Sequence, residues 1–93
     1  MDMTYISDEI RKHIVEDFLC GDDRGLHNDT DLHESGILDS FAILELVTLL
    51  DERFYVHFEP EDIDADNFRN IGTITQLVLR YLAKNEASVQ LSF

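Results

Sequence analysis

Ser40 is the residue whose type and place in this 93-residue sequence best suit chemistry. It stands where a loop should become a helix, in the run GILDSF over residues 36–41. Its hydroxyl can cap the free backbone N–H groups of the first helical turn. A phosphate esterified to that hydroxyl would also be stabilised, because a helix start gathers unpaired N–H donors and roughly half a positive charge. Both roles are compatible with the sequence.

A serine hydrolase would need a histidine base beside Ser40 and an acid to orient that base. Asp39 is a neighbour in sequence, which does not make a triad, and the Gly-x-Ser-x-Gly elbow is absent. His27, His33 or His57 could approach Ser40 in the fold, but the sequence gives no reason to expect it. We therefore expect no catalysis by this serine.

The acidic residues do not form a recognisable calcium loop. Residues 62–66 alternate aspartate with other residues as an EF-hand loop does, but Asn67 and Thr73 stand where glycine and glutamate are required. One cysteine and four scattered histidines show no paired spacing for zinc. We expect no specific metal site, and at most a loose association of divalent cations with the charged surface.

The elements that would position Ser40 are predicted by apolar residues at spacings of three and four. Alternation typical of strands is absent apart from residues 55–58. We expect an all-α fold, a small four-helix bundle of three main helices and one short helix. The expected helices cover residues of about 7–20, 40–55, 61–66 and 73–84.

The helix boundaries follow from capping residues and from the loss of periodicity. Ser7 or Asp8 is the expected N-cap of the first helix, and Thr73 of the last. Residues 22–39 form a long connection that would deliver the serine to the surface. Residues 85–93 lose the helical pattern, so we expect a flexible tail or a partner contact there.

The charge and cysteine content indicate where the protein works. Twenty acidic against seven basic residues give a formal charge of −13, which repels nucleic acid and anionic membranes and attracts basic protein patches. Cys20 is the single cysteine, and the sequence shows neither a signal peptide nor an apolar run of membrane-spanning length. We expect a monomeric, cytoplasmic protein with one domain over residues 1–93.

The run Asp39-Ser40-Phe41, followed by LELV at 44–47 and LDERF at 50–54, resembles the acyl carrier protein family. The similarity extends from about residue 6 to residue 82 and is strongest near the serine. It implies that Ser40 carries a 4′-phosphopantetheine arm whose terminal thiol holds an acyl group as a thioester. It also implies that Asp39 orients the loop or contacts the modifying enzyme.

The resemblance implies a shuttle without catalysis of its own. A phosphopantetheinyl transferase would load it, and ligases or synthases with basic docking patches would use it. The expected docking residues lie on the outward side of the second helix, unless the two apolar ones tuck under the preceding loop; they are Phe41, Leu44, Glu45, Thr48, Asp51 and Glu52. The residues expected around an acyl cavity are Ile43, Leu46, Val47, Leu50, Phe54, Ile63, Ile71, Ile74 and Leu77.

Three hypotheses remain for the cargo and the role. The first is an acyl carrier of fatty-acid or specialised lipid or polyketide biosynthesis. The second is an aminoacyl, D-alanyl or peptidyl carrier, because Ile37 and Leu38 before the site depart from the form common in fatty-acid synthesis. Phe41 also departs from the family's usual leucine. The third is an acidic interaction module without a prosthetic group.

Overall fold

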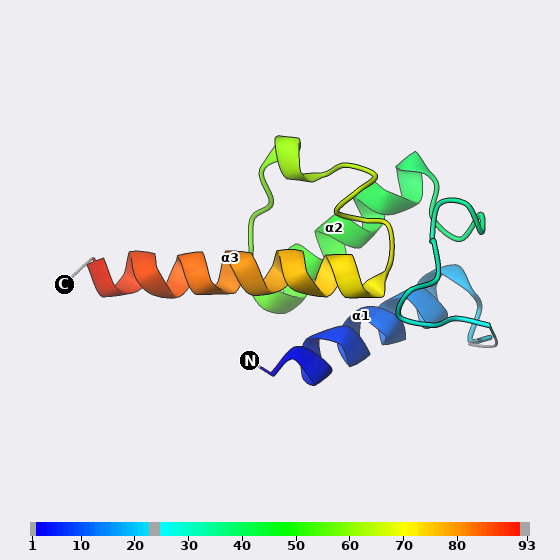
Figure 1. The fold of residues 1–93 in the computed structure, drawn as a ribbon, viewed down its shortest axis with the longest axis horizontal. Coiled ribbons are helices and arrows are strands. Elements are labelled where there is room, and N and C mark those ends of the chain that lie inside the picture. The colour runs from blue at the N-terminus through cyan, green and yellow to red at the C-terminus, as the bar shows by residue number, and fades with distance from the viewer. Residues whose placement is uncertain (1, 23–24, 92–93) are drawn as a thin grey trace.

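A computed structural model describes residues 2–22 and 25–91, with side chains for residues 2–22 and 25–84. The elements are α1 (Met3–Phe18), α2 (Ser40–Phe54), the three-residue 3-10 helix η1 (Pro60–Asp62) and α3 (Ile71–Leu91). The predicted all-α architecture is confirmed, and the described residues contain no strand. In Figure 1, α1 lies along the N-terminal half of α3, α2 crosses α3 in this view, and the C-terminal end of α3 extends past both.

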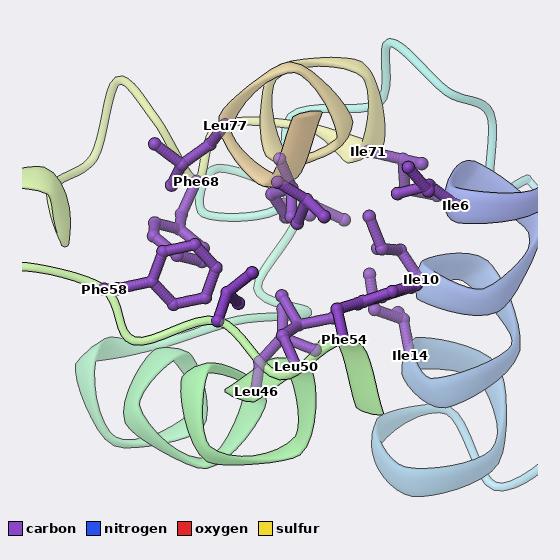
Figure 2. Close-up of a cluster of buried hydrophobic side chains, with 14 of the residues drawn as sticks. Ile6, Ile10, Ile14, Leu46, Leu50, Phe54, Phe58, Phe68, Ile71 and Leu77 are labelled. Carbon is purple, nitrogen blue, oxygen red and sulfur yellow. The ribbon is translucent and has the colours of Figure 1, made fainter. Parts of the chain in front are cut away.

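The three helices meet around one apolar core (Figure 2). Helix α1 contributes side chains spaced four residues apart, α2 contributes a stripe at the same spacing, and two phenylalanines come from the segment between α2 and α3. Each such side chain contributes about 1.5–3 kcal/mol on burial. The core includes Ile6, Ile10, Ile14, Leu46, Leu50, Phe54, Phe58, Phe68, Ile71, Ile74 and Leu77.

Helix α1 begins four residues earlier than predicted. Asp2 is its N-cap, and the Asp2 carboxylate accepts a hydrogen bond from the Thr4 N–H at 3.3 Å. Ser7 and Asp8 therefore lie inside the helix, and the prediction that one of them caps it is wrong. The physical reason is Ile6, which is fully buried and belongs to the same apolar stripe as the rest of the helix.

The first helix also ends earlier, at Phe18 instead of residue 20. Cys20 and Gly21 have positive φ angles of 53° and 87°, a left-handed conformation that stops a helix. The Gly21 N–H donates to the Val15 carbonyl at 2.8 Å, which satisfies one of the last free carbonyls of the helix. The chain then turns into the connection that leads to α2.

The predicted short helix over 61–66 is wrong beyond its first turn, because only Pro60–Asp62 is helical. In the residues that follow, side chains form hydrogen bonds with backbone groups that a helix would pair with one another. The Asp64 carboxylate accepts the Asn67 N–H at 2.8 Å, and the Asn67 amide donates to the Asp62 carbonyl at 2.9 Å. These two bonds fold residues 63–68 into turns instead of a helix.

Helix α3 begins at Ile71, and Thr73 is not its N-cap. Asn70 and Thr73 form a reciprocal pair, in which the Thr73 N–H donates to the Asn70 side chain at 2.8 Å and the Asn70 N–H donates to the Thr73 hydroxyl at 3.1 Å. The helix continues to Leu91, so the prediction that helical structure ends before residue 85 is wrong. Residues 92–93 of the predicted tail lie outside the described residues.

Candidate functional site

Asp39, not Ser40, caps the N-terminus of α2. The Asp39 carboxylate accepts the Ala42 N–H at 2.8 Å, and its carbonyl accepts the Ile43 N–H at 3.0 Å. Ser40 is the first helical residue and is exposed, and its hydroxyl has no hydrogen-bond partner among the described residues. The capping interpretation of Ser40 is therefore wrong, and its hydroxyl is free for modification.

The connection before Ser40 is fixed to the core by its leucines. Leu26, Leu32 and Leu38 are buried, although the residues around them are mostly exposed. The Leu38 N–H donates to the Leu32 carbonyl at 2.8 Å and closes residues 32–38 into a loop. The Leu32 N–H donates to the Arg69 carbonyl at 2.7 Å, which ties this loop to the segment before α3. Ser40 thus follows an anchored loop and not a flexible linker.

A groove of about 330 Å³ lies beside Ser40. One side of the groove comes from the first turns of α2, the opposite side from residues 63–65, and His33 contributes from the loop. Three of its residues were not predicted as site residues, because the sequence does not reveal which parts of the loop and of the segment before α3 come together here. The lining consists of His33, Ser40, Ile43, Leu44, Ile63, Asp64 and Ala65.

His33 and Ser40 line the same groove. Among the described residues no histidine hydrogen-bonds to Ser40, and the Asp39 carboxylate is already engaged by the Ala42 N–H. A nucleophilic serine needs a base within hydrogen-bonding reach and an acid that orients this base. The arrangement instead presents a bare hydroxyl that another enzyme can reach.

The two apolar residues predicted at the docking surface are exposed. Phe41 is 70% exposed and Leu44 is 57% exposed, so neither is tucked under the preceding loop. Both lie within the first two turns of α2, next to Ser40. Large apolar side chains this exposed beside a reactive group favour a contact surface for other proteins.

The other predicted docking residues of α2 differ in whether they line a groove. Glu45, Thr48 and Glu52 are exposed, and with Leu49 and Asp17 they line a groove of about 540 Å³ between α2 and α1. Asp51 does not line that groove. Its carboxylate lies 3.6 Å from Nδ1 of His57, an exposed histidine beyond the end of the helix. Asp17 was not predicted as part of this surface.

The nine predicted cavity residues belong to one core but differ in burial. Six of them are almost fully buried: Leu46, Leu50, Phe54, Ile71, Ile74 and Leu77. Ile43, Val47 and Ile63 are partly buried and pack against that core. Ile43 and Ile63 also line the groove beside Ser40, so this groove borders directly on the core.

Tyr81 of α3 supports the segment opposite α2. Its hydroxyl donates to the Asp62 carboxylate and accepts the Glu59 N–H at 2.8 Å. Burial raises the pKa of the Tyr81 hydroxyl, and the hydrogen bond to Asp62 raises it further. The ring also packs edge-on against Phe58, with 5.0 Å between the ring centroids. Residues 59–62, which lead into the groove, are thereby tied to α3.

The described residues contain neither a candidate metal site nor a helix that could span a membrane. Over the described part of the chain, no group of three or more His, Cys, Asp or Glu side chains is placed to hold a metal ion. No helix within the described ranges combines the length and apolar character needed to cross a membrane.

Comparison with known proteins identifies the family. Residues 8–78, which include Ser40, match the family model described as a phosphopantetheine attachment site. The chain is also 33% identical over 81 residues to the probable acyl carrier protein PigG of Serratia sp. (strain ATCC 39006), covering 87% of this chain and 93% of that protein. This chain belongs to the acyl carrier protein family.

The cofactor of this acyl carrier protein is 4′-phosphopantetheine, as the matched attachment domain shows. The hypothesis of an interaction module without a prosthetic group is therefore wrong. Members of the family typically carry intermediates and do not transform them, and they work with phosphopantetheinyl transferases and with biosynthetic enzymes. The described residues around Ser40 fit the arm, because the hydroxyl is exposed and unpaired beside a groove with apolar and polar lining.

Proposed function

We propose that Ser40 carries the 4′-phosphopantetheine arm and that the carrier passes an acyl group between enzymes as a thioester on this arm. The observation that carries the proposal is the Ser40 hydroxyl, exposed at the first position of a 15-residue helix and unpaired within the described structure. The arm, when bound, supplies a thiol at the end of a flexible chain. Asp39 caps α2 and so fixes where the arm is attached.

Loading by a phosphopantetheinyl transferase and coenzyme A tests this assignment. The wild-type chain should gain the mass of one arm, and Ser40→Ala should gain none. Ser35→Ala is the matched control, because Ser35 is also exposed but its hydroxyl donates to the Leu32 carbonyl at 3.3 Å. A mass gain in Ser40→Ala would refute the assignment.

Partner enzymes are proposed to dock on α2 through basic patches. Phe41 and Leu44 would supply apolar contacts next to the arm, and Glu45, Asp51 and Glu52 would supply the charge. The formal charge of −13 favours rapid encounter with positively charged surfaces, and a small contact allows rapid release. Thr48 lies on the same face, although its hydroxyl already donates to the Leu44 carbonyl at 3.1 Å. This combination suits a carrier that visits several enzymes in turn.

The proposed cargo is an acyl intermediate of fatty-acid or specialised lipid or polyketide biosynthesis. An acyl chain that passed from the groove between Ile43 and Ile63 would reach the buried core. Each methylene buried there would contribute about 0.8 kcal/mol, against the cost of parting closely packed side chains such as Leu46 and Leu77. Incubation of the loaded protein with ligases and either fatty acids or amino acids separates this cargo from an aminoacyl, D-alanyl or peptidyl one.

We propose that the carrier acts as a single-domain monomer in the cytoplasm. Its one cysteine, Cys20, is exposed, and a reducing compartment would keep its thiol free. The strongly acidic surface opposes self-association at low ionic strength. Light scattering over a range of salt concentrations tests the monomeric state, and a stable dimer would contradict it.

A further inference from the structure

We propose that the His33 imidazole binds the phosphodiester of the arm, and that Ile63 and Ala65 contact the apolar carbons next to that phosphate. This inference rests on the proposed attachment at Ser40. It gives the groove beside Ser40 a function, that of a subsite for the first part of the arm. His33 would be a positioning residue, which limits the directions in which the arm can leave the protein.

The backbone of His33 is held in place by its own loop. Its N–H donates to the Asp31 carboxylate at 3.0 Å, and its carbonyl accepts the Gly36 N–H at 3.1 Å. The preceding residue, Leu32, is fully buried. The imidazole itself is exposed, and among the described residues it takes part in no hydrogen bond or ion pair. A fixed backbone with an unengaged side chain is what a ligand contact requires.

The arm brings a negative charge to a protein that already carries a large excess of carboxylates. Among the described residues, His33 is the one basic side chain that lines the groove. Two arginines are engaged elsewhere: Arg69 lies 3.3 Å from the Asp66 carboxylate, and Arg53 lies 3.2 Å from Glu9 of α1. An imidazolium–phosphate hydrogen bond is charge-assisted and therefore stronger than a neutral one. It would add to the favourable field of the helix start.

The carboxylates near His33 do not replace the phosphate as its partner. Asp31 accepts two backbone N–H groups of the loop, and Asp39 accepts the Ala42 N–H. Asp64, on the opposite side of the groove, accepts the Asn67 N–H at 2.8 Å. Glu34 follows His33 directly and is exposed. None of these four carboxylates hydrogen-bonds to the His33 side chain among the described residues.

The groove has the mixed character that the first part of the arm requires. The phosphate of the arm is followed by a methylene, then by a carbon that bears two methyl groups, and then by a hydroxyl and an amide. Ile63 and Ala65 stand across the groove from Ile43 of α2 and offer apolar contact to these methyl groups. Residues 59–62, which precede this side, are tied to α3 through Tyr81. The subsite would therefore exist before the arm is attached.

NMR of the unloaded and loaded wild-type protein tests the inference without any substitution. Intact mass first establishes that each loaded sample carries one arm. The ring resonances of His33 should shift on loading. Those of His27 and His57, which do not line the groove, should not shift. In loaded His33→Asn, the ³¹P resonance of the phosphodiester should differ from that of wild type, whereas loaded His57→Asn should match wild type.

The outcomes separate this inference from the proposed function. A full mass gain with unchanged His33 ring resonances would overturn the inference and leave Ser40 as the attachment residue. A wild-type chain that gains no mass would overturn both. Should His33→Asn fold or load poorly, the comparison of unloaded and loaded wild type still decides the question.

Discussion

The Tyr81 hydroxyl of α3 donates a hydrogen bond to the Asp62 carboxylate, which lies at the end of η1. The same hydroxyl accepts the Glu59 N–H at 2.8 Å, so one buried phenol fixes both sides of the 3-10 turn. This turn leads directly into residues 63–65, which form one side of the groove beside Ser40. A contact in the core thus shapes the surface where the arm is proposed to lie.

Tyr81→Phe should destabilise the protein by about 1–3 kcal/mol, because the Glu59 N–H loses its acceptor and the Asp62 carboxylate loses a donor. Urea denaturation followed by circular dichroism measures the change. Tyr55→Phe is the matched control, since Tyr55 is 86% exposed and should change the stability by less than about 0.5 kcal/mol. Equal stability of Tyr81→Phe and wild type would contradict the proposed role of the phenol.

The ionisation of the Tyr81 hydroxyl should make the free energy of unfolding depend on pH. Burial raises the pKa of Tyr81 above its unfolded value, so the folded state favours the protonated hydroxyl. Its contribution is complete below the unfolded pKa of about 10 and is lost as the pH rises through the folded pKa. Wild type should therefore lose stability more steeply than Tyr81→Phe as the pH rises above about 10. Parallel curves for the two proteins in that range would refute the linkage.

The stability that the Asp39 cap contributes can be measured separately from the attachment of the arm to Ser40. Asp39→Ala removes the carboxylate that accepts the Ala42 N–H and should cost about 1 kcal/mol of stability, within a range of about 0.5–2. Asp39→Asn keeps an acceptor oxygen at the same place and should lose only a few tenths of that amount. If Asp39→Ala were as stable as wild type, Asp39 would not cap α2 in solution.

Charge reversal on the outward side of α2 should slow the docking of partner enzymes. Glu45→Lys should lower kcat/KM of loading by about tenfold at low salt, and the loss should shrink as ionic strength rises. Glu16→Lys on α1 makes the same charge change at another exposed glutamate and should have little effect. Equal losses in the two variants would indicate a response to net charge instead of a docking surface on α2.

The sequence predicted the parts of this fold that depend on local pattern. The stripe with Leu46, Leu50 and Phe54 predicted α2 to within one residue of its end, because its apolar side faces a continuous core. The exposure of Ser40 was consistent with its position at a helix start. The capping residue was assigned to the wrong neighbour, since Asp39 and Ser40 are both good N-caps and only the backbone conformation distinguishes them.

The sequence failed where side chains compete with the backbone or where distant segments meet. No local sequence pattern predicts that the Asn67 side-chain amide donates to the Asp62 carbonyl, which would otherwise accept a backbone N–H in a helix. The residue before His33, Leu32, hydrogen-bonds to Arg69, which is 37 positions away by residue number, and no local pattern predicts this bond. His33, Asp64 and Ala65 were therefore not predicted as site residues.

The attachment site can be tested most directly on protein purified from its native host. Proteolysis and tandem mass spectrometry of this material locate the arm within a peptide. Our account predicts a single phosphopantetheine on Ser40, and no arm on Ser7 or Ser35, the exposed or partly exposed serines used for comparison. An unmodified Ser40 in protein that carries its arm on another residue would contradict the account.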